Sequence, residues 1–147
     1  PLIIADGLQA MRLVRRRAAE WAIAPNRIGI MGFSAGGHLT TGVALEYDAD
    51  SRPDFAAPIY SSPYEDISVP VDAPPLFIAV AHDDAFAASA SVPLYSAWSA
   101  AGRSAELHIY SKGGHGFGMN RQGLPSDHWI DHFGEWLQVQ GVLEPPR

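Results

Sequence analysis

The chain contains no cysteine, which excludes a disulfide framework, a thiolate metal site and a cysteine nucleophile. Charge is also sparse, because only 18% of the 147 residues are charged and the formal net charge is −6. No basic patch is evident, so nucleic acid and anionic membrane surfaces are poor matches as partners. No apolar run approaches the length that crosses a bilayer. What remains, with 47% apolar residues, is the composition of a globular protein.

Internal repeats and linker-like tracts are absent as well, so residues 1–147 are predicted to form one domain around one core. The chain begins with Pro1 rather than methionine, so residue 1 need not be the native start, and a signal peptide would lie outside this sequence. A cysteine-free chain fits either side of a membrane. The sequence therefore predicts a soluble protein and leaves its compartment open between cytoplasmic and secreted.

Apolar residues alternate between the periodicities of helices and of strands. Apolar spacings of three and four predict a helix over residues 5–21, with most of its arginines off the apolar face. Nearly continuous apolar runs predict strands that are covered on both faces, at 27–33, 55–60, 76–81 and 105–111. Further helices are predicted at 36–46, at 92–101 and from Ser126 as N-cap to Gly141. This order predicts an α/β fold, with an open, mostly parallel sheet of about four strands and flanking helices.

Residues 29–38 read GIMGFSAGGH and place Ser34 between a predicted strand and a predicted helix. A serine at such a turn projects its hydroxyl above the sheet, and Gly32 and Gly36 are expected to keep the turn free of collisions. The helix N-terminus favours negative charge beside Ser34, and the N–H of Ala35 would face a developing oxyanion. A glycine-rich turn that opens a helix and binds an anion is the alternative interpretation.

A serine hydroxyl is a weak nucleophile unless a base takes its proton, and histidine suits that role because its ordinary pKa lies near neutrality. His115 lies in the glycine-rich segment 113–118 that follows the last predicted strand. The other five histidines have simpler expected roles: His38 lines a pocket one turn after Ser34, His108 packs within a strand, His128 and His132 lie on a helix surface, and His82 pairs with nearby acids.

Two adjacent carboxylates, Asp83 and Asp84, follow the third predicted strand. Sites in open parallel sheets form beyond the carboxyl ends of the strands, which is where Ser34 and His115 are also expected. One aspartate is expected to orient His115 while the other caps the loop or faces solvent, and the residues alone do not choose between them. No further acid lies nearby in the sequence, so we expect no metal here.

The chain order serine, aspartate, histidine is that of α/β-hydrolase triads, and three motifs carry the same resemblance. They are NRIGIMGFSAGGH at 26–38, APPLFIAVAHDD at 73–84 and ELHIYSKGGHGFG at 106–118. The chain is most similar to bacterial carboxylesterases that include acetyl-xylan and feruloyl esterase-like members. The resemblance implies a cofactor-free serine hydrolase of short-chain or sugar-linked acyl esters. It also implies Ser34 as nucleophile, His115 as base and Asp84, with Asp83 in reserve, as acid.

Several side chains near the predicted strand ends are expected to line the substrate site: Phe33, His38, Tyr64 and Phe117, with Tyr60 and Phe86 as further aromatic candidates. Two features depart from the family pattern. Residues 85–88 read AFAA where such families show an apolar residue followed by Val-Pro. The chain also has no His-Gly-Gly loop to complete an oxyanion hole, so it resembles the C-terminal part of the fold.

That second departure has two expected consequences. With the Ala35 N–H as sole donor, turnover is expected to fall about 100- to 1,000-fold unless water, Tyr64 or a second chain donates. The strand at 27–33 is expected to be an unguarded edge, which predicts a homo-oligomer that pairs strands across a two-fold axis, unless the first helix covers the edge. A non-catalytic module for binding or assembly, and a hydrolase of peptides or lactones, are the alternative functions.

Overall fold

The computed structural model describes residues 2–143, and its four strands form a single parallel sheet in the order β1-β2-β3-β4. The elements are α1 (Leu2–Arg17), β1 (Ile30–Phe33), α2 (Ala35–Glu46), β2 (Ala56–Ile59), β3 (Leu76–Ala81), α3 (Ala85–Ala100), β4 (Ala105–Tyr110), the 3₁₀ turn η1 (Pro125–His128) and α4 (Trp129–Val139). The predicted α/β class and four-stranded parallel sheet are confirmed.

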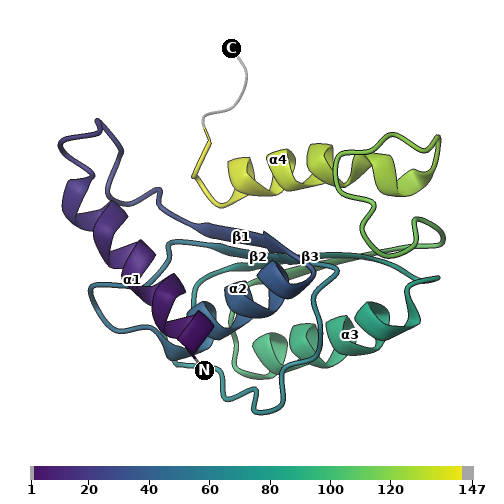
Figure 1. Cartoon of the computed structure of the whole chain (residues 1–147), viewed down its shortest axis with the longest axis horizontal. Coiled ribbons are helices and arrows are strands. Elements are labelled where there is room, and N and C mark those ends of the chain that lie inside the picture. The colour runs from purple at the N-terminus through teal and green to yellow at the C-terminus, as the bar shows by residue number, and fades with distance from the viewer. Residues whose placement is uncertain (1, 144–147) are drawn as a thin grey trace.

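Helices cover both faces of the sheet. Figure 1 shows α1, α2 and α3 on one side and α4 on the other. Every residue of β2 and β3 is buried, which explains why their sequences are continuously apolar rather than alternating. The side chains of α4 pack with these strands in one cluster that includes Phe77 and Trp136, while Trp98 of α3 packs with Leu76 and Ile78 on the opposite face. The sheet is therefore a rigid platform whose loops carry the candidate site.

The bounds of three helices differ clearly from the predicted ones. Helix α1 ends at Arg17 instead of residue 21, because the chain turns there and Ala22 takes a positive φ of 54°. Helix α3 begins at Ala85, well before residue 92, because Asp84 caps it and Pro93 is accommodated inside the helix. Ser126 lies in η1 and does not cap the last helix, which begins at Trp129.

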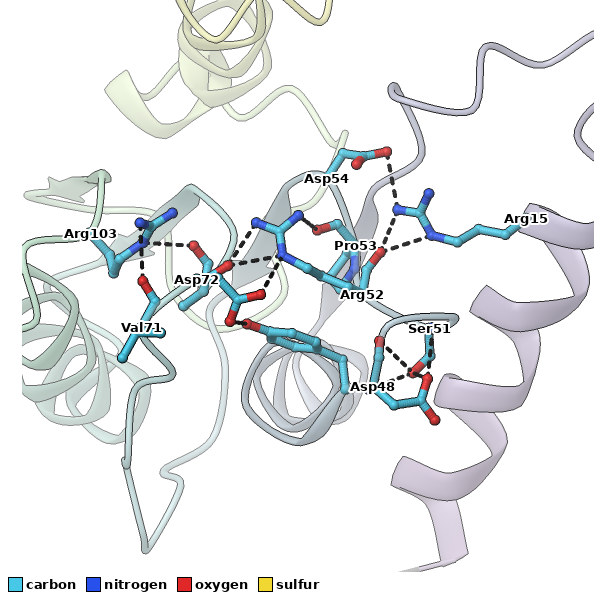
Figure 2. Close-up of polar contacts among 11 residues, drawn as sticks. Arg15, Asp48, Ser51, Arg52, Pro53, Asp54, Val71, Asp72 and Arg103 are labelled. Carbon is cyan, nitrogen blue, oxygen red and sulfur yellow. Dashed lines mark hydrogen bonds and ion pairs between the residues drawn. The ribbon is translucent and has the colours of Figure 1, made fainter.

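Arginine side chains tie together the segments that precede the strands, at the end of the sheet opposite the candidate site (Figure 2). From α1, the Arg15 Nε donates to the carbonyl of Arg52 at 2.9 Å, and its guanidinium lies 3.2 Å from Asp54. Arg52 in turn donates to the carbonyl of Asp72 at 2.9 Å, and Arg103 donates to that of Ala73 at the same distance. These contacts satisfy loop carbonyls before β2 and β3, so this end of the sheet serves the fold.

Candidate active site

Ser34 occupies a strained turn between β1 and α2. Its backbone has φ 55° and ψ −116°, a region that residues with a side chain rarely enter. The Ser34 N–H still donates to the carbonyl of Ile59 on β2 at 3.0 Å, so the sheet holds the residue in this conformation. The Ser34 Oγ lies 2.7 Å from Nε2 of His115, within hydrogen-bond distance.

The two glycines that flank Ser34 differ in how closely they are packed. A Cβ atom at Gly32 would lie 2.1 Å from the carbonyl oxygen of Gly36 and 2.8 Å from Oγ1 of Thr40, so only glycine fits there. A Cβ at Gly36 would meet no atom within 4 Å. The expectation that both positions must be small is therefore correct for Gly32 and wrong for Gly36, because the helix turns its second residue toward open space.

This difference predicts opposite results for the same substitution at two positions. Gly32→Ala is expected to lower the free energy of unfolding by roughly 1–3 kcal/mol, since the clash involves backbone that cannot move aside. Gly36→Ala is expected to be neutral or stabilising by up to about 1 kcal/mol, because alanine is the better helix former. Urea denaturation of both variants measures the difference. Equal losses of stability would contradict this description of the turn.

His115 is held on its far side by Asp84 and not by Asp83. The His115 Nδ1 lies 2.5 Å from Oδ2 of Asp84, whose side chain is 6% exposed against 46% for His115. The other carboxylate oxygen of Asp84 accepts the N–H of Ala87 at 3.2 Å and so caps α3. Asp83 instead accepts the N–H of Gly114 at 2.8 Å. Asp84 therefore contacts the imidazole, whereas Asp83 contacts the backbone beside it.

The first turn of α2 points its N–H groups toward Ser34. The helix starts at Ala35, and no side chain caps it at Ser34. Unpaired N–H groups and the dipole of a 12-residue helix make this position favourable for negative charge. Ala35 directly follows Ser34 and is the first residue of α2, so its N–H is the candidate donor to an oxyanion formed at Ser34.

A groove of about 610 Å³ runs along α2 beside this site, lined by His38, Glu46, Tyr64, Glu65 and Asp66 among others. The rings of His38 and Tyr64 are in contact, with centroids 4.9 Å apart. The Tyr64 hydroxyl donates to Glu46, and burial followed by that carboxylate raises the pKa of Tyr64 to about 12. The expectation that Tyr64 donates to an oxyanion is therefore not met, because its hydroxyl is engaged by Glu46.

The predicted aromatic lining lies deeper than expected. Phe117 is 2% exposed and its ring packs against Tyr60 at 4.7 Å, which corrects the expectation that it contacts substrate. Phe33 is half-buried between the rings of Tyr60 and Trp129, each 5.7 Å away. Tyr60 itself is 4% exposed and joins Phe33, His115 and Phe117. The sequence named Tyr60 as a further candidate for the substrate lining, but it did not predict that its ring would join these three residues.

The remaining histidines contribute no chemistry at this site. His108 packs within its strand as predicted and stacks on His132 at 4.6 Å, so His132 is not the surface residue that was expected. His128 is exposed and faces Asp131, and the exposed His82 pairs with neither aspartate. Within residues 2–143, no three His, Cys, Asp or Glu side chains are arranged to hold a metal ion. No helix in that range has the length and hydropathy to span a membrane.

Comparison with known proteins finds similar sequences and similar folds. A family model described as the alpha/beta hydrolase fold matches residues 1–73, which include Ser34. An acetylxylan esterase from Xylanibacter ruminicola is 44% identical over 57 residues, which is 39% of this chain and 12% of that protein.

Solved structures match over much more of the chain. An acetyl ester-xyloside bifunctional hydrolase from Caldicellulosiruptor lactoaceticus has a TM-score of 0.84 at 27% identity and covers 95% of this chain. MGS-M1, an alpha/beta hydrolase enzyme from a Medee basin deep-sea metagenome library, has a TM-score of 0.83 at 25% identity and also covers 95%. The matches span 66% and 65% of those two proteins, so this chain corresponds to about two thirds of their length. Its strand order, its turn at Ser34 and these solved structures together show that the chain has the alpha/beta hydrolase fold.

Proposed function

We propose that this chain hydrolyses carboxylic esters through Ser34 as nucleophile, His115 as general base and acid, and Asp84 as the group that orients the imidazole. One observation carries the proposal. A continuous line of contacts runs from the Ser34 hydroxyl to Nε2 of His115 at 2.7 Å and from Nδ1 of His115 to Asp84 at 2.5 Å. The three side chains come from the carboxyl ends of β1, β3 and β4, where open parallel sheets carry their sites.

The proposed reaction proceeds in two halves. The Ser34 Oγ attacks the ester carbonyl while Nε2 of His115 takes its proton, and the oxyanion forms beside the Ala35 N–H. His115 then gives that proton to the leaving alcohol as the carbon–oxygen bond breaks, which leaves an acyl group on Ser34. Water repeats the sequence, with His115 as base, and releases the acid. Asp84 accepts the hydrogen bond of Nδ1 throughout and stabilises the imidazolium.

Two measurements together test this function: the hydrolysis of an ester, and the covalent labelling of Ser34 by an inhibitor. The protein is expected to hydrolyse a chromogenic acetate ester, and a serine-directed phosphonate is expected to stop the reaction while adding one phosphonyl group. Peptide mass spectrometry should find that group on Ser34. Denatured protein serves as the control, because only the folded site activates the hydroxyl. Absence of both hydrolysis and labelling would favour a non-catalytic module, and labelling at another serine would assign the activity elsewhere.

We infer that the substrate is a short-chain ester of a neutral, hydroxyl-rich alcohol that lies in the groove against His38 and Tyr64. The groove has an aromatic wall and carries Glu46, Glu65 and Asp66 without a lysine or arginine. Carboxylates accept hydrogen bonds from hydroxyls and repel anions. Acetylated xylose is expected to be hydrolysed faster than an ester of matched size that carries a free carboxylate. This preference for the neutral ester should weaken in Glu46→Gln. A faster anionic ester would contradict this assignment.

We propose in addition that two copies of the chain pair along β1. The strand is uncharged, its Met31 side chain is 42% exposed, and within residues 2–143 only β2 pairs with it. Such an edge offers free N–H and C=O groups for another strand. Gel filtration with light scattering at micromolar concentration is expected to give a dimer, and Met31→Lys is expected to shift it to monomer. A wild-type monomer would contradict the pairing.

A further inference from the structure

Tyr60 connects the turn of Ser34 to the loop of His115. Its ring centroid lies 5.2 Å from that of His115, 4.7 Å from that of Phe117 and 5.7 Å from that of Phe33, the residue before Ser34. Burial raises the pKa of Tyr60, so its hydroxyl stays neutral. One side chain at the end of β2 thus contacts the end of β1 and the loop that follows β4.

The backbone of Tyr60 is strained to reach this position. Its φ is 35°, one of three positive values that non-glycine residues take within residues 2–143, and another of the three belongs to Ser34. A tyrosine in this region persists only where its surroundings hold it there. Here the Tyr60 N–H donates to the carbonyl of Ala79 at 2.8 Å and the side chain is 4% exposed, so both sheet and core fix the residue.

The loop that carries His115 needs such a support. Gly114, Gly116 and Gly118 all have positive φ, so the loop has little conformational preference of its own. Asp83 holds it before His115 by accepting the N–H of Gly114 at 2.8 Å. After His115, the indole N–H of Trp129 donates to the carbonyl of Gly118 at 2.7 Å. Neither contact touches the imidazole itself, whereas the Tyr60 ring does.

From this geometry we propose that Tyr60 is a positioning residue, whose ring edge and face contacts set the distance between Ser34 and Nε2 of His115. The inference rests on the proposed function of those two residues. An imidazole displaced by about 1 Å loses up to about 100-fold in rate, although the substrate still binds. The ring matters more than the hydroxyl, because the ring is the part that touches His115.

The test compares Tyr60→Leu and Tyr60→Phe with Phe77→Leu as a matched control. Phe77 lies in the same core cluster, is 0% exposed, and its ring contacts are with His108, Phe133 and Trp136 rather than with His115. Tyr60→Leu is expected to lower kcat about tenfold or more with KM changed less than about twofold. Tyr60→Phe is expected to recover most of kcat. Phe77→Leu is expected to lower the melting temperature with kcat per folded molecule unchanged.

A second readout needs no substrate. The proton between Nδ1 of His115 and Asp84 gives a downfield proton NMR signal, which we expect to be lost or broadened in Tyr60→Leu and kept in Tyr60→Phe and Phe77→Leu. If Tyr60→Leu does not fold, Tyr60→Met is judged by the same criteria. An unchanged signal and kcat in the folded variant would overturn the proposal. If wild-type protein hydrolyses no ester, the signal alone still decides whether Tyr60 positions the imidazole.

Discussion

Replacing Ser34 by alanine is expected to lower kcat for a chromogenic acetate ester by about 10⁴- to 10⁶-fold. The substitution removes the only atom that the proposed mechanism uses to attack the carbonyl, while the contact of His115 with Asp84 at 2.5 Å remains in place. What activity is left would come from water activated in the site. Phosphonate labelling is expected to disappear together with turnover.

The matched control is Ser89→Ala, which removes a hydroxyl from the exposed face of α3. The Ser89 Oγ donates only to the carbonyl of Phe86 one turn earlier, so turnover and labelling should stay at the wild-type level. The melting temperatures of both variants should lie close to that of wild type. Equal turnover in Ser34→Ala and wild type would end the serine hypothesis, whatever the geometry of the three side chains.

The adjacent aspartates predict the second large effect. Asp84→Asn is expected to lower kcat by about 10⁴-fold, because an amide N–H cannot accept the hydrogen bond of Nδ1 and the imidazole takes the wrong tautomer. Asparagine still caps a helix, so the N–H of Ala87 keeps its partner and stability should change little. Activity and stability are thereby separated in one variant.

Asp83→Asn is the control at the neighbouring residue. The amide oxygen still accepts the N–H of Gly114, so kcat should stay within about threefold of wild type. Steady-state kinetics with the same acetate ester measures both variants. Comparable losses at the two positions would mean that the pair acts as one charged unit rather than through Asp84 alone.

The sequence predicted those parts of the molecule that depend on local pattern. Continuous apolar runs located β2 and β3 because both strands are buried on both faces, and the alternation of strands with helices predicted a parallel sheet, whose loops after the strands lie at one end. The start of α3 was missed because the cap at Asp84 sets it, and the helix then continues through Pro93. Cap strength and proline tolerance depend on tertiary context, which a pattern does not contain.

Side-chain direction was harder to predict than position along the chain. Phe117 and Tyr64 lie near the strand ends as expected. However, the ring of Phe117 is buried in the core, and the hydroxyl of Tyr64 donates to Glu46. The choice between Asp83 and Asp84 depended on which of the two carboxylates faces His115. Two adjacent residues of the same type carry no sequence pattern that decides this. Tyr60 was undervalued for the same reason, since its contacts join segments that are far apart in the sequence.

The arginine contacts around Arg15 and Arg52 lie at the amino ends of the strands, away from the loops that carry Ser34, Asp84 and His115. The residues that hold the loops at this end of the sheet are therefore different from the residues proposed for catalysis. A library of variants that changes only the groove residues would leave these arginine contacts intact. Substrate preference should therefore be open to selection with little loss of correctly folded protein. In variants selected for heat resistance, by contrast, substitutions should accumulate around the arginine contacts, and the original substrate preference should be kept.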